Sequence, residues 1–295
     1  MKKTLKFIAN PIAGGDSRKK IVRAQEYFTR QGYQVDITLT AARGDAEQAG
    51  RAARDGGYER VVAAGGDGTL NEVVNGLTPS AIPLAFIPLG TTNVFALEVG
   101  IPFNVEEACA IALQGTVEDV CIGRAGEKNF LLMAGVGFDA EAVYRVSSGL
   151  KRHTGKFAYL VSALSALVQP SFPLQVELED GRSLQAYNAI ISNARLYGGR
   201  FSITPQASLK EDRLDVCLFK KPGRWRLLRY AATVATGQPL NSADVEMLQC
   251  RSLAVNGDRM PVQIDGDYLG RLPMTFNVLS GQLRMVLPQS TGSKP

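Results

Sequence analysis

The glycine-rich run GGDGTLNEV, from Gly65 to Val73, is the first segment whose residue types suggest chemistry. It follows the apolar stretch Val61–Ala64 and precedes a helical pattern, so backbone N–H groups and the positive end of a helix dipole converge there. Glycine allows a phosphate to approach the backbone closely and accepts a positive φ, and such a nest binds anions. Taken alone, the run is equally consistent with a strand-to-helix turn that binds nothing.

Two further polar, glycine-containing turns follow apolar strands. Asn10–Gly15 (NPIAGG) comes after Leu5–Ala9, and Pro88–Asn93 (PLGTTN) comes after Leu84–Ile87. In an open α/β sheet, ligands bind beyond the carboxyl ends of the strands, so we expect the three turns to lie at one edge. Neither the Walker-A pattern nor GxGxxG occurs in them. Together they predict a nucleotide phosphate site.

Alternating strand and helix patterns must position these turns. Strands are expected at Leu5–Ala9, Tyr33–Leu39, Val61–Ala64 and Leu84–Ile87, and helices after Ser17, at Asp45–Asp55, from Thr69 to Asn75 and at Val105–Gln114. This order indicates βαβ units and a mostly parallel sheet with helices on both faces. We therefore predict an α/β domain over residues 1–124.

Strand patterns dominate beyond about residue 120. They are expected at Phe130–Ala134, Leu174–Glu179, Ala186–Asn193, Leu214–Phe219, Ser252–Asn256, Val262–Ile264 and Leu283–Leu287, with a hairpin turn at Glu179-Asp180-Gly181. One long helical stretch, roughly Ala140 to Gln169, interrupts them. We predict a β-rich, sandwich-like domain over residues 125–288, a cleft between the two domains, and a flexible tail over 289–295.

Composition argues against several other classes. The single histidine, His153, and the absence of a GxSxG elbow argue against a Ser-His-Asp hydrolase. The cysteines are far apart and form no CxxC pair, which favours buried reduced thiols over a zinc site or a redox dithiol: Cys109, Cys121, Cys217 and Cys250. The formal charge of +5 favours anionic partners, and we find no nucleic-acid-binding motif.

The three turns, in this order and spacing, resemble the diacylglycerol kinase catalytic family, whose soluble bacterial lipid kinases are similar over almost the whole chain. The second half continues the resemblance. Its matching elements are Gly135–Asp139, Tyr197-Gly198-Gly199 followed by Pro205 and Ala207, Asp212–Val216, and Ile264–Asp267. The resemblance implies an ATP-dependent lipid kinase, a phosphotransferase with an alcohol acceptor in phospholipid metabolism.

The resemblance also implies roles for individual residues. Nucleotide contacts fall on Thr40, Gly65, Gly66, Asp67, Gly68, Thr69, Leu70, Asn71 and Thr91. Asp265 matches the proton acceptor, and Leu209, Asp212 and Leu214 match a structural Mg²⁺ site in which the leucines act through their carbonyls. Asp67 is the acid expected near a catalytic Mg²⁺, acting through water. From the residues alone, Asp265-Gly266 is a strong hairpin-turn signal.

Three features depart from the family pattern. Val94 stands where the family usually has Asp after the Asn of the PLGTxN turn, so a charged network near the site has lost one acid. Asp267 replaces Glu in the late DGE motif, which shortens that side chain by one methylene. Arg200 and Arg213 replace glycines, and a surface position is the simpler interpretation of both.

A lipid substrate requires access to a membrane surface. The longest mostly apolar run, Phe157–Val168, is too short to span a bilayer. Two basic clusters could meet lipid headgroups: Lys151, Arg152 and Lys156 before that run, and Lys220, Lys221, Arg224, Arg226 and Arg229 around Trp225. The alternative for each cluster is a solvated helix face over a core; it is the preferred interpretation of the first cluster, and the second cluster fits both interpretations equally. We expect a cytoplasmic protein, peripheral on the inner face of the membrane, that uses ATP and a lipid and binds no nucleic acid.

Two alternatives stay open. An NAD kinase shares the GGDGT run and a similar architecture, although the PLGTTN turn and the late DGD motif argue against it. A catalytically impaired protein of the same fold that only binds nucleotide or lipid is the other, and Val94 is its best support. The sequence does not choose among diacylglycerol, monoacylglycerol, phosphatidylglycerol, ceramide and sphingoid bases, nor does it indicate an oligomeric state.

Overall fold

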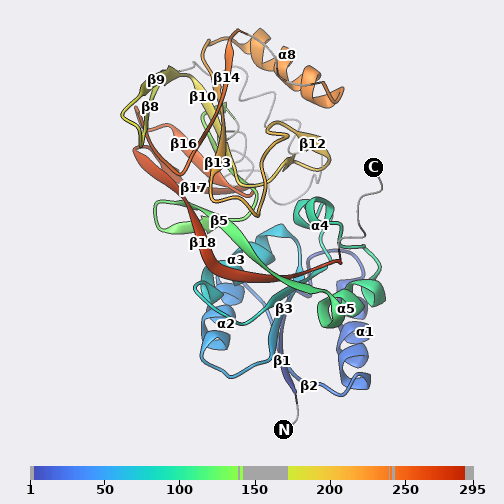
Figure 1. Ribbon diagram of the computed structural model, residues 1–295. Coiled ribbons are helices and arrows are strands. Elements are labelled where there is room, and N and C mark those ends of the chain that lie inside the picture. Colours follow the sequence, from blue (N-terminus) through green and yellow to red (C-terminus); the bar gives the residue numbers. More distant parts are fainter. Residues whose placement is uncertain (1–2, 139, 142–171, 239, 241–242, 290–295) are drawn as a thin grey trace. The chain divides into compact units, whose positions relative to one another are not determined.

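The computed structural model describes residues 3–138, 140–141, 172–238, 240 and 243–289 (Figure 1). The chain forms two compact units, each described by itself below. The N-terminal unit comprises residues 1–121 and 280–295, and the C-terminal unit comprises residues 122–279. Strand β18 (Met274–Leu287) therefore begins in the C-terminal unit and ends in the N-terminal one.

A parallel sheet forms the centre of the N-terminal unit. Its strands are β1 (Thr4–Ala9), β2 (Gln34–Leu39), β3 (Arg60–Gly65) and β4 (Leu84–Pro88), in the order β2-β1-β3-β4. The end of β18 adds parallel to β4, where Met285 lies opposite Leu84. Strands β3 and β4 are almost entirely buried, as continuous apolar runs in a covered parallel sheet must be. The predicted α/β architecture is confirmed.

Helices cover both faces of this sheet: α1 (Ser17–Arg30), α2 (Asp45–Arg54), α3 (Asp67–Leu77), α4 (Val94–Val99) and α5 (Val105–Gln114). Helices α2 and α3 pack together on one face, and α1 and α5 on the other (Figure 1). In α1 the apolar stripe Ile21, Ala24 and Phe28 is buried, as its helical spacing predicts. The Phe28 ring meets Phe7 of β1 edge to face, with centroids 5.7 Å apart.

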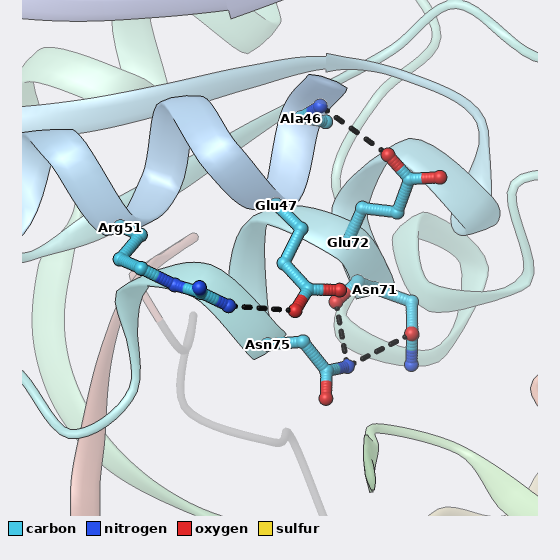
Figure 2. Close-up of polar contacts among 6 residues, drawn as sticks. All are labelled: Ala46, Glu47, Arg51, Asn71, Glu72 and Asn75. Atoms are coloured by element: carbon cyan, nitrogen blue, oxygen red, sulfur yellow. Dashed lines mark hydrogen bonds and ion pairs between the residues drawn. The ribbon is translucent and has the colours of Figure 1, made fainter. Parts of the chain in front are cut away.

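Helices α2 and α3 approach so closely that glycines are required at the crossing. A Cβ added at Gly76 would lie 2.0 Å from the Glu47 carbonyl oxygen, and one at Gly50 would lie 2.8 Å from the Val73 carbonyl oxygen. Polar side chains also join the two helices: Glu72 of α3 accepts the backbone N–H of Ala46 at 3.3 Å (Figure 2). The crossing fixes α3, whose N-terminus carries the glycine-rich run.

Two antiparallel sheets form the C-terminal unit. One has the order β14-β13-β10-β7-β16-β17, and the other contains β18-β15-β8-β9, with β5 paired to β18 and β6 to β5. The strand bounds are β5 (Thr116–Ala125), β6 (Lys128–Phe130), β7 (Met133–Val136), β8 (Leu174–Leu178), β9 (Ser183–Ala186), β10 (Asn188–Ser192), β13 (Leu214–Phe219), β14 (Val245–Cys250), β15 (Ser252–Gly257), β16 (Pro261–Ile264) and β17 (Asp267–Arg271). The short strands β11 (Leu196–Tyr197) and β12 (Phe201–Ser202) pair with each other, and helix α8 spans Arg224–Ala235. The predicted β-rich second domain is confirmed.

Local differences from the sequence expectations have physical causes. The strand expected over Phe130–Ala134 is divided into β6 and β7, where the N–H groups of Leu131 and Leu132 donate to the Asp265 side chain and not to a neighbouring strand. Helix α8 carries the basic cluster around Trp225, so one of the two interpretations that the sequence left open for this cluster, a solvated helix face, has the correct secondary structure. The helical stretch predicted near 140–169 and the predicted tail lie almost entirely outside the described residues.

The cysteines agree with the expectation of buried thiols. All four cysteines are buried and free of disulfides. Burial raises the thiol pKa of Cys109, Cys217 and Cys250 to about 12, so these groups are neutral at ordinary pH. Within the part of the chain that the structure describes, no helix is long and apolar enough to cross a bilayer.

The close crossing of α2 and α3 gives a stability prediction. Gly76→Ala should lower the free energy of unfolding by about 2 kcal/mol, because the new Cβ meets backbone that cannot move aside. Helix propensity alone would favour alanine by about 1 kcal/mol, so the contact decides the sign. Urea unfolding measures the change. Gly15→Ala is the matched control, since no atom lies within 4 Å of its added Cβ; equal stability of both variants would refute the close contact.

Candidate functional site

The carboxyl ends of the parallel strands gather the predicted turns at one edge of the N-terminal unit. Backbone bonds continue past the strands: Thr40 N–H donates to the Ala9 carbonyl at 2.9 Å, and Asn10 N–H donates to the Ala64 carbonyl at 2.8 Å. The N–H groups of Leu89 and Gly90 both donate to the Gly65 carbonyl, at 2.7 and 3.1 Å. The three turns therefore adjoin one another in space, as their positions after the strands predicted.

Glycines allow the backbones of these turns to touch. A Cβ added at Gly90 would lie 2.7 Å from Gly66 Cα, and one at Gly14 would lie 2.6 Å from the Leu89 carbonyl oxygen. A side-chain hydrogen bond connects the Asn10–Gly15 turn to the glycine-rich run, because Asn10 Nδ2 donates to Thr69 Oγ1 at 3.3 Å. The edge is thus a continuous surface of backbone from three turns, with little side-chain bulk between them.

The N-terminus of α3 supplies the anion-binding element. Gly66 occupies the N-cap position, and no side chain caps the first turn in the described structure. The first N–H groups of a helix have no intrahelical partners and carry the positive end of the dipole, so they suit a phosphate. Gly68, in this first turn, is exposed, and so is Thr91 of the third turn. This edge can bind the phosphates of a nucleotide.

Asp67 has a different set of partners from those expected of a residue beside a metal. Its two carboxylate oxygens accept the N–H groups of Val94 and Phe95, at 2.9 and 3.0 Å. It therefore caps the N-terminus of α4 and ties the third turn to the glycine-rich run. Burial raises the pKa of the Asp67 carboxyl above its ordinary value, and the N–H groups of Phe95 and Val94 partly oppose that shift.

Thr40 and its loop are held from two sides. The Asp45 carboxylate accepts the N–H groups of Ala41 and Ala42, at 2.7 and 2.8 Å, which closes the loop onto the start of α2. Glu72 of α3 adds the bond to Ala46 N–H in the same turn (Figure 2). The sequence did not indicate this role for Glu72, although its place in the GGDGTLNEV run was a signal. It links the Thr40 loop to the helix of the phosphate site.

The remaining predicted nucleotide residues divide by exposure. Gly65, Thr69, Leu70 and Thr40 are buried, whereas Gly66, Asp67 and Asn71 are half-buried. Asn71 accepts from Asn75 Nδ2 through both its backbone oxygen and its Oδ1, each at 3.0 Å (Figure 2). The buried members shape the edge from within, while Gly68 and Thr91 present their surfaces to a ligand.

In the C-terminal unit, Asp265 lies in the hairpin turn between β16 and β17, as its Asp-Gly pair predicted. Asp265 has φ 47° and Gly266 has φ 86°, the left-handed pair of a type I′ turn. Its carboxylate accepts three backbone N–H groups, from Leu131 at 2.8 Å, Leu132 at 2.9 Å and Met133 at 3.0 Å. Such donors fix the position of the carboxylate.

The segment that binds Asp265 is itself held in place by a buried asparagine. Asn193 Nδ2 donates to the Leu131 carbonyl at 2.8 Å, and Asn193 N–H donates to the Leu132 carbonyl at 2.8 Å. On the hairpin side, Gln263 Oε1 accepts Gly266 N–H at 2.8 Å. Asp265 therefore occupies a preorganised position set by residues far from it in sequence.

The predicted Mg²⁺ ligands fit a hard cation. Asp212 Oδ1 is buried and has no hydrogen-bond partner among the described residues, while its Oδ2 pairs with Arg251. Leu209 and Leu214 are buried nearby in sequence, and a carboxylate with backbone carbonyls is a typical Mg²⁺ or Ca²⁺ donor set. In the part of the chain that is described, no cluster of three or more His, Cys, Asp or Glu side chains could hold a metal.

An apolar cavity of about 260 Å³ lies in the C-terminal unit. Strands β7, β10 and β13 provide one wall, through residues such as Val136, Ile190 and Phe219, and helix α8 provides another. Its lining is almost entirely apolar, which suits a hydrocarbon chain more than a polar ligand. The sequence pointed to a lipid but could not locate or size this space.

The structure gives a position to each residue that departs from the family motifs. Val94 is buried at the first residue of α4, and its N–H bonds to Asp67. Arg213 pairs with Glu211, and Arg200 is exposed, which agrees with a surface position for both arginines. Asp267 begins β17, directly after the turn that contains Asp265.

Two family models match this chain. Residues 4–125 match the family model "Diacylglycerol kinase catalytic domain". Residues 133–287 match the model "YegS C-terminal NAD kinase beta sandwich-like domain". The two matches together cover both units described above.

Individual relatives agree with the family models. A diacylglycerol kinase of Bacillus subtilis (strain 168) is 32% identical over 97% of each chain. The crystal structure of a diacylglycerol kinase from Bacillus anthracis has a TM-score of 0.80 at 25% identity, covering 99% of each chain. An NAD kinase from Archaeoglobus fulgidus, solved in complex with ATP, has a TM-score of 0.51 at 12% identity over 97% of this chain and 94% of its own, which shows a shared fold.

The buried Asp67 carboxylate gives a prediction with a defined pH sign. Because the pKa of Asp67 is raised in the folded state, the folded protein binds more protons than the unfolded chain at pH values just above the ordinary aspartate pKa. The contribution of Asp67 to stability therefore falls as the pH rises through that range. The asparagine of Asp67→Asn does not titrate, and its single amide oxygen cannot replace both carboxylate oxygens as acceptors of the two N–H groups. It should destabilise the protein by about 1–3 kcal/mol at the acid end, and by less at neutral pH.

Urea unfolding of both proteins between pH 4.5 and pH 7 measures this difference. A destabilisation by Asp67→Asn that grows with pH would contradict the raised pKa. Asp55→Asn, at an acid one residue beyond the end of α2, is the control and should show no such trend.

Proposed function

The chain belongs to the diacylglycerol kinase catalytic family, and from this premise we propose that it transfers the γ-phosphoryl group of ATP to a hydroxyl of diacylglycerol or a similar membrane lipid. The observation that carries the proposal furthest is the edge where the three turns adjoin, since it offers uncapped helix N–H groups and glycine backbone together. Phosphoryl transfer depends on positioning and on charge neutralisation more than on covalent chemistry. A preorganised edge of this kind supplies the positioning.

The nucleotide contacts of the proposal come from this edge. Gly68 and the first turn of α3 would hold phosphate oxygens through backbone N–H groups, and the exposed Thr91 hydroxyl would add a donor. Thr40 would contact the nucleotide from the loop that Asp45 and Glu72 hold. Asp67 acts here by positioning: its bonds to Val94 and Phe95 set the distance between the phosphate loop and the Thr91 turn.

Asp265 is the general base of the proposal. Its carboxylate would accept the proton of the lipid hydroxyl as that oxygen bonds to the γ-phosphorus and the bond to the β,γ-bridging oxygen breaks, leaving ADP. Three N–H donors hold the carboxylate in a fixed position, which prepares it to receive a proton without rearrangement. We assign to it positioning of the hydroxyl as well as proton acceptance.

The acceptor's hydrocarbon chain would occupy the apolar cavity of the C-terminal unit. Burial of methylene groups there would stabilise the complex by about 0.8 kcal/mol per CH₂. Such a space favours a lipid over a nicotinamide dinucleotide, which carries two riboses and a charged diphosphate. The shared fold with an NAD kinase is therefore not evidence for NAD as the acceptor.

Mg²⁺ would be held at Leu209, Asp212 and Leu214 in this proposal. The buried, unpartnered Asp212 Oδ1 supports it, because such an oxygen is costly without a cation or a donor. A bound divalent cation supplies positive charge that offsets buried carboxylate and stabilises the local loop. The residues' own contribution is to hold one carboxylate and two carbonyl oxygens in the segment before and at the start of β13.

Val94 does not by itself argue for an inactive protein. The family's usual acid is missing at this position, yet the carboxylate of Asp67 lies 2.9 Å from the Val94 nitrogen. The site thus keeps one carboxylate next to the position that lost one. We propose an active enzyme on this ground.

A direct transfer assay tests the proposed function. The protein is incubated with ATP labelled in the γ-phosphoryl group, Mg²⁺, and separately diacylglycerol, monoacylglycerol, phosphatidylglycerol, ceramide, a sphingoid base or NAD, with the lipids in mixed micelles. Labelled phosphatidic acid, or another phosphorylated lipid, is expected. Labelled NADP as the main product, or ATP binding with no transfer to any acceptor, would contradict the proposal.

Asp265→Asn should reduce the turnover number for lipid phosphorylation by at least about a hundredfold, the range of general-base catalysis. It should also lower stability by about 1–3 kcal/mol, because an amide cannot accept all three N–H bonds. Initial rates at saturating ATP, corrected for folded protein by circular dichroism, measure the effect.

Gln263→Ala is the matched control for this substitution. It removes the acceptor of Gly266 N–H and so perturbs the same hairpin, but it leaves the Asp265 carboxylate in place. Its turnover number should stay within about threefold of the wild type. Near-normal activity of Asp265→Asn, or equal losses in both variants, would remove Asp265 from the role of base.

Mg²⁺ should raise the melting temperature of the wild-type protein by a few degrees, because a ligand that binds only the folded state stabilises it by mass action. Asp212→Asn should abolish that increase, since it removes the charge beside the buried oxygen. Glu211→Gln, at the neighbouring acid that pairs with Arg213, should retain it. Thermal unfolding with Mg²⁺ and with EDTA gives the comparison; an equal Mg²⁺ response in Asp212→Asn would place the cation elsewhere.

A further inference from the structure

We propose that the outer face of helix α8 docks on an anionic lipid surface and opens the apolar cavity toward the bilayer. This inference deepens the proposed function, because it names the membrane-binding face of the C-terminal unit. The docking face is defined as Trp225, Leu228 and Ala232, with the basic residues Lys220, Lys221, Arg226 and Arg229.

Helix α8 has two apolar faces where a surface helix normally has one. The inner face contributes Leu227, Tyr230, Ala231, Val234 and Ala235 to the cavity wall. Tyr230 is buried against Phe219, with ring centroids 5.1 Å apart. On the outer face, Trp225 is 75% exposed and Leu228 is 40% exposed. Ala232, one turn after Leu228, is also exposed. A water-facing helix surface is ordinarily polar, so this outer face indicates a partner.

Charge selects the partner. From Lys220 to Ala243 the sequence contains five basic residues, Lys220, Lys221, Arg224, Arg226 and Arg229, and no acidic residue. Two acids at the following strand, Asp244 and Glu246, pair with part of this set: Arg226 and Arg229 lie 3.0 and 3.8 Å from Asp244, and Lys220 lies 3.2 Å from Glu246. The segment therefore keeps a net positive charge around an exposed tryptophan. Tryptophan beside basic residues suits the headgroup layer of an anionic membrane.

The cavity joins the two faces of the helix. Ala231 and Ala235 line the cavity and are also exposed, so the cavity wall reaches the molecular surface along the helix, three and seven residues after Leu228. A docked outer face would bring this rim to the level of the acyl chains. A lipid could then move a chain from the bilayer into the cavity without passing through water, which saves the hydrophobic cost of exposing that chain.

A membrane fits this face better than a second protein does. The exposed apolar surface consists of one tryptophan, one leucine and small alanines, whereas a stable protein interface buries about 800 Å² on each partner. Peripheral membrane binding needs only a few inserted side chains together with electrostatic attraction. The structure therefore favours a lipid surface as the occupant.

Trp225 provides the test, since it is the only tryptophan of the chain. The full-length protein without ATP is mixed with vesicles of phosphatidylcholine containing phosphatidylglycerol, and with vesicles of pure phosphatidylcholine. Tryptophan emission should shift to shorter wavelength and become protected from iodide quenching only on the anionic vesicles, and high salt should reverse both changes. Binding with unchanged emission, an equal response on pure phosphatidylcholine, or no binding would overturn the proposal.

Substitutions assign the effect to the docking face. Leu228→Ser and Lys221→Glu should each weaken vesicle binding by roughly fivefold or more in co-sedimentation. Val22→Ser and Arg23→Glu, at exposed positions of α1 in the other unit, are the matched apolar and charge controls and should bind as the wild type does. Equal losses in tests and controls would contradict a specific face. A blue shift that grows with protein concentration in the absence of vesicles would instead indicate a second copy as the occupant.

The kinase reaction separates this inference from the proposed function. Leu228→Ser and Lys221→Glu should phosphorylate a short-chain diacylglycerol dispersed in water at the wild-type rate and lose activity only toward lipid in vesicles. No transfer to either substrate by the wild type would refute the proposed function and leave the fluorescence result to stand. Wild-type transfer with an unchanged tryptophan spectrum would refute the docking face alone.

Discussion

Three backbone N–H groups converge on the Asp265 carboxylate, and the position of that carboxylate depends on this set of hydrogen bonds. The donors lie at Leu131, Leu132 and Met133, where the strand expected from the sequence divides into two. A buried N–H group without an acceptor is costly, so the break between β6 and β7 is stable only because the Asp265 carboxylate accepts these N–H groups. Asp67 has the same role in the N-terminal unit toward Val94 and Phe95. In both units an acid of the family motif is also the acceptor that holds the local backbone.

Close backbone contact is the complementary constraint in the N-terminal unit. Gly90 lies against Gly66, and Gly14 lies against the Leu89 carbonyl, so the turns adjoin without side chains between them. Gly50 and Gly76 likewise allow close backbone contact where α2 and α3 cross. These contacts leave few degrees of freedom for the edge that would receive phosphates. Preorganisation of this kind reduces the entropy that binding and transfer must otherwise supply.

The sequence predicted the parts of this arrangement that follow from local pattern. The parallel sheet rule placed the turns after β1, β3 and β4 at one edge, and the Asp-Gly pair placed Asp265 in a hairpin turn. The partners of the two carboxylates could not be predicted, because Leu131 lies 134 residues from Asp265 and no local pattern marks an unpaired N–H. The return of β18 to the N-terminal unit was also hidden, since Met285 joins β4 through tertiary pairing. The basic cluster around Trp225 was visible as composition, whereas its position on a helix over a cavity required the fold.

The proposed reaction uses a nucleotide edge, a fixed carboxylate and an apolar cavity, and in it the γ-phosphoryl group of ATP is transferred to the hydroxyl oxygen of a lipid. Oxygen labelling tests that claim most directly. The protein is supplied with ATP carrying ¹⁸O in its γ-phosphoryl oxygens and with unlabelled diacylglycerol, and the lipid product is analysed by mass spectrometry. We expect phosphatidic acid whose phosphoryl oxygens are labelled and whose ester oxygen, from the lipid, is not labelled. Label recovered only as inorganic phosphate, with unmodified diacylglycerol, would contradict it.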